Sequence, residues 1–312
     1  MSEQFLFKCD VEDELNHVPI SAEDEHWQES WCLAWFDPHT RVGGFHHIGL
    51  ARNRNVADAW SWISHRGEVV QKYQNNALPP DNVDFATRIK LGPLEVSTIE
   101  PLVRRRILMR DGGVEASLDF TAVTDAVKFS ADSRASHWEH SGLVEGTATF
   151  GGRTISVRGY AFQYRSWGPR DWATKETYRW AWGYFSKDFQ FSVFNITDSG
   201  IQPDGHLEKG YVLEGGRQHR VVKVDITVGM GGDGVSPEEV TLTAWTDEDA
   251  AYRFRGHCDG ASVHTHRSGF MMADACTNWV HGDRIGAGFV EVNELKRPNA
   301  RLRAQLNLGS DD

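Results

Sequence analysis

A histidine and a glutamate two positions apart form the first pair in this sequence that could transfer protons. They are His137 and Glu139, within residues 136–140, and in an extended strand both side chains lie on the same face. A carboxylate fixes the tautomer of a neighbouring imidazole, and such a pair suits general acid–base catalysis. The alternative is a solvated ion pair, which contributes little to stability. We take both residues as catalytic candidates.

Charged and aromatic residues are concentrated in residues 164–172, just past the middle of the chain. Gly168-Pro169 predicts a turn there, because proline fixes φ and glycine adopts conformations that other residues avoid. One interpretation places polar side chains of this segment at a cavity that has tryptophan walls. The polar candidates are Tyr164, Arg165 and Asp171, and the walls are Trp167 and Trp172. The alternative, favoured for Arg170 and Asp171, is a structural clamp in which they hydrogen-bond the backbone at the turn.

Tryptophan is unusually frequent, with 12 residues beside 16 Phe and 7 Tyr. Residues 29–37 and 178–185 both predict strands, and each carries tryptophans at alternate positions, which places them on one face. These are Trp31 and Trp35, with Glu29 on the same face as a further candidate acid, and Trp180 and Trp182. The rings either fill β-sheet cores or line a cavity for an apolar ligand.

Histidines occur in two further patterns. His46 and His47 are consecutive in a predicted strand, so they point to opposite faces, and the sequence leaves open which one faces inward. His264 and His266 share a strand face, as metal ligands can, but no third ligand stands at a suitable spacing. We therefore predict no metal site.

Nearly the whole chain predicts short β-strands, separated by hairpin turns at intervals of about eight to twelve residues, which is typical of antiparallel sandwiches and barrels. The exception is residues 56–65, where Val56, Ala59, Trp60 and Ile63 have an approximately helical spacing. We predict an all-β protein with one short helix in this segment.

Length and composition restrict the class of protein. A chain of 312 residues predicts two domains, which we place at residues 1–165 and 166–312. The net charge is −11 without a basic block, so we expect no nucleic-acid partner. The sequence has no run of about eighteen apolar residues, so we expect no membrane span. The acidic N-terminus resembles no signal peptide and the four cysteines lack CxxC spacing, so we expect a cytoplasmic protein.

The sequence contains no standard motif for nucleotide binding or for a serine hydrolase. It has no Walker A motif, no GxGxxG between a strand and a helix, and no GxSxG nucleophile elbow. The glycine-rich residues 229–234 fit a hairpin loop instead. We therefore expect no cofactor.

Four segments together resemble a known family. Residues 159–172 resemble the central motif of the AttH-like, carotenoid 1,2-hydratase-like proteins, approximately G-x-G-x-R-D-H-S-W-G-x-R-D-W, in particular a bacterial branch of uncharacterised two-domain proteins. Residues 29–31, 137–140 and 281–291 are similar to its other short motifs. The resemblance implies two tandem lipocalin-like antiparallel β-barrels with one or two short helices. It also implies hydration or cyclisation of isoprenoid or polyketide substrates without a redox cofactor.

The sequence departs from that family at one place. Gln163, Tyr164 and Arg165 stand where the family motif has Arg-Asp-His. The Asp and His are the obvious proton-transfer groups of the motif, so a hydratase mechanism does not carry over directly. Tyr164 could still donate a proton, and Arg165 could stabilise an anion or an oxygen lone pair.

Two functions follow as expectations. The first is a cofactor-independent hydratase, dehydratase, isomerase or cyclase that uses acid–base and carbocation chemistry on an apolar, terpenoid-like or polycyclic substrate. The second is a lipophile-binding protein without chemistry, or a Diels–Alderase-like pericyclase that acts by shape. In each case the partner is a small apolar molecule, and a homodimer is left open.

Overall fold

The computed structural model describes residues 6–19, 21–130, 132, 134–198, 206–266 and 271–294. The chain divides into two compact units, Met1–Asp171 and Trp172–Asp312. The sequence placed the boundary after residue 165, whereas strand β13 (Arg153–Pro169) continues beyond that point. Within the described ranges, helical structure consists of three 3-10 turns, η1 (Val11–Glu14), η2 (Arg52–Arg54) and η3 (Trp172–Thr174). None of the helices in these ranges is long and apolar enough to cross a membrane.

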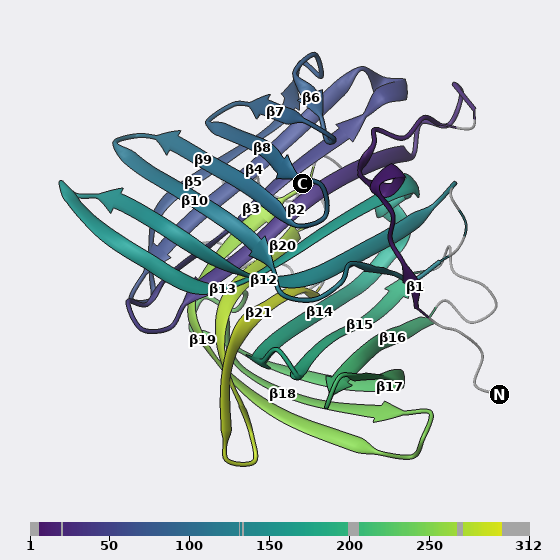
Figure 1. The fold of residues 1–312 in the computed structure, drawn as a ribbon, viewed down its shortest axis with the longest axis vertical. Helices are drawn as coiled ribbons and strands as arrows, with labels where there is room; N and C mark the ends of the chain where they lie inside the picture. Colours follow the sequence, from purple (N-terminus) through teal and green to yellow (C-terminus); the bar gives the residue numbers. More distant parts are fainter. Residues whose placement is uncertain are drawn as a thin grey trace, which may run out of the picture. The chain divides into compact units, whose positions relative to one another are not determined.

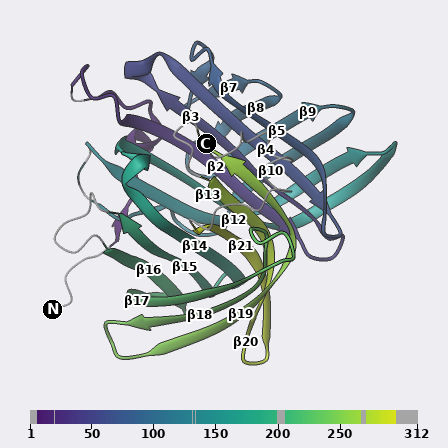
Figure 2. The ribbon, with the colours of Figure 1, turned by 180° about the vertical axis from the view of Figure 1, so that it is seen from behind.

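The first unit is one antiparallel sheet that does not close by backbone pairing (Figures 1 and 2, purple to teal). Its strands run in the order β5-β4-β3-β2-β13-β12-β10-β9-β8-β7-β6, with β1 paired to β11 and β11 to β12. Besides β13, the bounds are β1 (Phe7–Lys8), β2 (Trp27–Asp37), β3 (Val42–Ala51), β4 (Val56–His65), β5 (Glu68–Leu78), β6 (Val83–Asp84), β7 (Arg88–Leu91), β8 (Leu94–Glu100), β9 (Arg104–Asp111), β10 (Val114–Ala122), β11 (Val127–Lys128) and β12 (Ser136–Phe150).

Side chains bring the two ends of this sheet together. Gln71 Nε2 in β5 donates to Asp111 Oδ2 at 3.0 Å, and the Tyr73 hydroxyl lies against Gly92 in the turn between β7 and β8. A large apolar core cluster, which includes Trp31, Trp35 and Phe85, fills the concave side. The first unit is therefore a half-barrel with a core rather than a flat sheet.

The second unit is a closed antiparallel barrel of eight strands (Figures 1 and 2, teal to yellow). Its strands are β14 (Lys175–Ser186), β15 (Phe189–Asp198), β16 (His206–Glu214), β17 (Arg217–Met230), β18 (Pro237–Thr246), β19 (Ala251–Thr265), β20 (Met271–His281) and β21 (Arg284–Glu294). β14 closes the barrel by pairing with both β15 and β21. The all-β, tandem lipocalin-like prediction is confirmed, with one of the two expected barrels left half open.

The helix predicted for residues 56–65 is wrong, because these residues form strand β4. Ala57, Ala59 and Ile63 belong to the core of the first unit, while Trp60 and Trp62 on the opposite face are buried as well. A strand that is buried on both faces shows no alternation of apolar and polar residues, so its pattern can be mistaken for a helix.

The turn predicted at Gly168-Pro169 is also wrong. β13 continues through both residues, and Gly168 pairs with Gln28 and Pro169 with Trp27. Gly168 has a φ of +124°, and a Cβ there would lie 2.6 Å from Ala135 Cβ, so glycine is needed for close packing within the strand. Pro169 is the last residue of the strand, where a missing N–H is tolerated.

Candidate functional site

Strand alternation divides the polar residues of the first unit between two faces. Trp31, Leu33 and Trp35 of β2 lie in the core, so Cys32 between them points to the opposite side of the sheet. We call the core side the inner face and the opposite side the outer face. This rule decides His46 and His47: Ile48 lies in the core, so His46 is on the inner face and His47 on the outer face.

A row of five side chains crosses the outer face at one level. Direct register partners join Glu139 of β12 to Tyr164 of β13, Tyr164 to Cys32 of β2, Cys32 to His47 of β3, and His47 to Trp60 of β4. Register partners share a face and lie close to one another. We call this row, together with His137 and Asp58, the outer-face cluster.

The predicted proton-transfer pair lies at one end of this cluster. His137 Nε2 is 2.8 Å from Glu139 Oε2, and the Glu139 side chain is fully buried while His137 is 16% exposed. The second carboxylate oxygen, Glu139 Oε1, is buried and has no hydrogen-bond partner among the described residues. The His137 and Tyr164 rings are 5.3 Å apart. A buried carboxylate with one free oxygen beside an imidazole and a phenol can accept or donate protons.

At the other end of the outer-face cluster, a thiol contacts an imidazole, and the imidazole contacts a carboxylate. Cys32 Sγ is 3.1 Å from His47 Nδ1, and His47 Nε2 is 3.0 Å from Asp58 Oδ1. If Nε2–H donates to the carboxylate, Nδ1 is the acceptor of the thiol proton. The imidazole is also stacked on Trp60, with ring centroids 4.1 Å apart. The ring is therefore held in one orientation, as a general base must be.

Three residues of this cluster, Cys32, His47 and Asp58, were missed by the sequence analysis. His47 was noted without a partner, because its neighbours lie in different strands. Alternation within each strand is the signal that could have placed the three on one face. Only the pairing register of β2, β3 and β4 shows that they touch.

Glu29 and Arg165, two other predicted catalytic residues, lie on the inner face. Arg165 Nη2 is 3.0 Å from Glu29 Oε2, and both side chains are fully buried. His17 also contacts this carboxylate, through its backbone N–H at 3.1 Å and Nδ1 at 3.3 Å. Arg52 Nε lies 3.5 Å from the other oxygen. Three basic groups thus surround one buried carboxylate.

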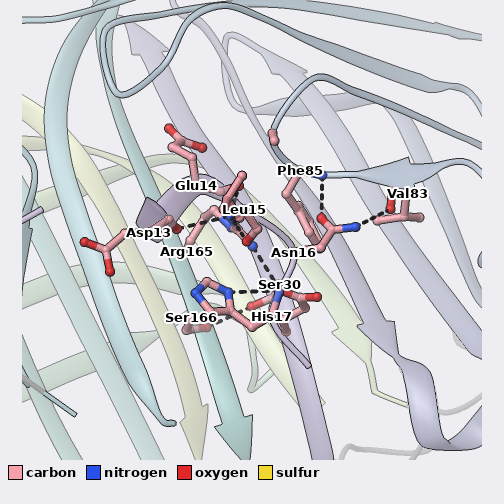
Figure 3. A network of polar contacts seen from close by, with 12 residues as sticks. Asp13, Glu14, Leu15, Asn16, His17, Ser30, Val83, Phe85, Arg165 and Ser166 are labelled. Atoms are coloured by element: carbon pink, nitrogen blue, oxygen red, sulfur yellow. Dashed lines mark hydrogen bonds and ion pairs between the residues drawn. The ribbon is translucent and has the colours of Figure 1, made fainter. Parts of the chain in front are cut away.

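Arg165 also holds the N-terminal segment against the sheet (Figure 3). Its Nη1 donates to the backbone carbonyls of Asp13, Glu14 and Leu15, at 3.3, 2.6 and 3.2 Å. Burial lowers the pKa of the guanidinium to about 10, and the nearby Glu29 and Glu14 carboxylates oppose that shift. The Glu14 side chain pairs with Arg105, which is buried as well. These contacts indicate a structural tie rather than a group that is free to act on a substrate.

The predicted tryptophans of the first unit belong to the inner face as well. Trp31 and Trp35 lie in the core, and the indole N–H of Trp35 donates to His46 Nε2 at 3.1 Å. Trp167 lies in a smaller core cluster and stacks on His17, with ring centroids 3.7 Å apart. Their surroundings are those of core residues.

The remaining predicted residues are spread over both units. Asp171 is 40% exposed, with His26 Nδ1 at 4.0 Å from its carboxylate. Trp172 in η3 lies in the second unit, where its ring is 5.0 Å from that of His266. Trp180 and Trp182 flank Ala181, a core residue of the barrel, so both rings point to the outside of the barrel. Neither of these two strand tryptophans lines the barrel interior.

The described residues include no group of three or more His, Cys, Asp or Glu side chains that could hold a metal ion. His264, one of the two histidines considered for a metal, instead lies 3.1 Å from Asp274.

The chain has the tandem lipocalin-like fold of a solved protein assigned as AttH. By sequence it belongs to a family described as a domain of unknown function (DUF7064), whose model matches residues 10–296. No curated protein matches the chain.

Three solved structures resemble the whole chain. A protein from Nitrosomonas europaea assigned as AttH (NE1406) has a TM-score of 0.67 and 14% identity, over 86% of this chain and 93% of that one. CghA has a TM-score of 0.64 and 11% identity, over 93% of this chain and 98% of CghA. Kievitone hydratase from Nectria haematococca has a TM-score of 0.63 and 11% identity, over 89% and 93%. At these identities the likeness establishes the fold alone.

Proposed function

We propose that this protein is a cofactor-independent enzyme that moves protons on an apolar, terpenoid-like or polycyclic substrate. The outer-face cluster carries the proposal, because it places two imidazoles, each held by a carboxylate, on either side of Tyr164 and Cys32. The reaction would be a hydration, dehydration, isomerisation or cyclisation. A fold shared with kievitone hydratase supports this class of reaction.

The roles follow from the geometry. Glu139 would be the base, since its Oε1 accepts no hydrogen bond from any described residue, and His137 would hold the carboxylate in place. Tyr164, the register partner of Glu139 and half-buried beside it, would donate a proton to a substrate oxygen or alkene. Trp60 would offer an aromatic face to a cationic intermediate.

Deuterium incorporation tests the proposal directly. The protein is incubated in D2O with a panel of prenyl alcohols and alkenes, and products and recovered substrate are analysed by mass spectrometry. Wild type should place deuterium on carbon, and Glu139→Gln or Tyr164→Phe should slow this by about 10²- to 10⁴-fold.

Glu115→Gln is the matched control, since Glu115 is an exposed glutamate in β10 that pairs with Arg110. It should keep the wild-type rate. Recovery of bound but unlabelled ligand from wild type and both variants alike would overturn the proposal in favour of a lipophile-binding protein.

A further inference from the structure

The outer-face cluster belongs to the first unit. The closed barrel of the second unit also has a buried polar row, on the outer side of the barrel. Val263, Ala273 and Val290 are barrel-core residues, so their neighbours in the strands point outward. Direct register partners join Trp180 of β14 to Glu291 of β21, Glu291 to Asp274 of β20, and Asp274 to Ser262 of β19. These four side chains therefore lie side by side on one face.

The carboxyl groups of Glu291 and Asp274 are adjacent in this row and are hydrogen-bonded to each other. Glu291 hydrogen-bonds Asp274 and Tyr178, and it is buried, with 3% of its surface exposed. Burial raises the pKa of Glu291 well above its usual value, and the charge of Asp274 raises it further. Two carboxylates in contact cannot both ionise at low cost, so the pair holds one proton at neutral pH.

Groups on each neighbouring strand contact the carboxyl pair. His264 Nε2 in β19 lies 3.1 Å from Asp274 Oδ2. Tyr178 in β14 hydrogen-bonds Glu291 from the other side. Because burial and the charge of Asp274 raise the pKa of Glu291, we assign the proton to Glu291, which is then a neutral carboxylic acid between a carboxylate and a phenol.

Two further polar atoms beside the pair have no hydrogen-bond partner within the part of the chain that the structure describes. Ser262 Oγ, opposite Asp274, and Asn293 Oδ1, two residues after Glu291, are both buried. Asn293 uses only its amide nitrogen, which donates to the backbone of Met271. Unpaired buried polar atoms are costly, and here they lie around an acid that can donate a proton.

Aromatic rings lie beside these polar groups on the same face. The Trp180 ring is 6.1 Å from Phe194 and 5.9 Å from Phe289. Apolar rings beside a few polar groups are the usual composition of a small-molecule site.

We propose that Glu291, Asp274, His264 and Tyr178 form a proton-donating site for an apolar molecule that carries a single hydroxyl or carbonyl oxygen. Glu291 donates its proton or hydrogen bond to that oxygen, and Ser262 supplies a second polar contact. Glu291 was missed as a site residue, although it ends the segment 281–291 that resembles the family motif. All side chains of the proposed site come from the second unit, whereas the outer-face cluster comes from the first.

Infrared difference spectroscopy of the whole protein at neutral pH tests the proposal without an activity assay. Wild type should show the C=O stretch of a buried protonated carboxylic acid, and Glu291→Gln should remove it. Addition of geraniol, citral or β-ionone should shift that band, since the acid changes its hydrogen-bond partner. Glu239→Gln is the control, because Glu239 is an exposed glutamate of the same barrel that pairs with His257. It should keep both the band and the shift.

Calorimetric titration with geraniol gives a second measurement. Glu291→Leu should weaken binding at least tenfold, provided that circular dichroism shows the variant to be folded, and Glu239→Gln should not change it. If the Glu291→Leu substitution prevents folding, the isosteric Glu291→Gln variant still decides through the infrared band. A wild-type protein without the band, or with a band that none of the three molecules shifts, would overturn the proposal.

Discussion

Adjacent residues in β13 have unrelated roles, because they lie on opposite faces of the sheet. Tyr164 belongs to the outer-face cluster, while Arg165 is buried on the inner face against Glu29 and three backbone carbonyls. The sequence grouped the two as one polar constellation. The structure makes Arg165 a group whose removal should change stability.

Arg165→Met should lower the free energy of unfolding by about 3–5 kcal/mol, because it leaves the buried Glu29 carboxylate with less compensation. Urea denaturation followed by circular dichroism measures this change. The double variant Glu29→Gln, Arg165→Met should recover part of the loss, since the buried carboxylate charge is removed together with its fully buried partner. The control is Arg106→Met, which removes an exposed partner of Asp119 and should leave the midpoint unchanged. An unchanged midpoint in Arg165→Met would refute the structural tie.

Two buried histidines should make the protein sensitive to acid. Burial lowers the pKa of His46 and of His140 from 6.5 to about 3, and the positive charge of Arg105 adds to the shift at His140. Between these values the unfolded chain binds a proton that the folded chain does not. The stabilisation is therefore complete above pH 6.5 and is lost as the pH falls toward 3.

Each histidine should contribute a slope of about 1.4 kcal/mol per pH unit to the free energy of unfolding within this window. His140→Gln should flatten the measured slope between pH 6 and 4 by about that amount, in urea titrations at several pH values. His39→Gln should not, because His39 is exposed in the turn after β2. Equal slopes in wild type and His140→Gln would contradict the assignment.

At the scale of elements, barrel closure depends on the close approach of β14 and β21. A Cβ at Gly288 would lie 2.0 Å from the backbone oxygen of Trp182, a separation that no side chain tolerates. Gly288 belongs to the segment 281–291 that resembles the family motif. The glycine of that motif is thus explained by packing between the two strands that close the barrel.

Gly288→Ala should destabilise the second unit by about 1–3 kcal/mol or more, because strands β14 and β21 must separate to admit the methyl group. Thermal unfolding followed by circular dichroism measures the effect. Gly232→Ala is the matched control, since a Cβ at Gly232 meets nothing within 4 Å. Similar unfolding midpoints for both variants would show that β14 and β21 can separate at this point without loss of stability.

The sequence predicted strand β2 correctly and strand β4 wrongly, although both strands are buried on both faces. The alternation around Trp31 and Trp35 gave the correct strand, whereas the apolar residues on both sides of β4 suggested a helix. The pair His137–Glu139 was predictable because both residues lie in one strand. The contact of Cys32 with His47, and of Asp274 with Glu291, depends on pairing between strands, which no local pattern encodes.

At the scale of the whole molecule, the two units differ in whether their sheets have free edges. Each barrel strand of the second unit pairs with a neighbour on either side, and β14 and β21 complete the ring. The sheet of the first unit ends at β5 and β6, and β5 contacts β9 and the turn before β8 through Gln71 and Tyr73. An edge strand leaves every second amide without a partner strand.

Hydrogen exchange measured by mass spectrometry should therefore separate β5 from the other long strands. Peptides from β5 should exchange earlier than those from β2, which lies between β13 and β3, and earlier than those from β20, which lies between β19 and β21. β2 is the control within the same unit, so a difference cannot be due to the stability of that unit as a whole. Exchange in β5 as slow as in β2 would mean that the amides of β5 are hydrogen-bonded on both sides. The half-barrel would then be closed in solution.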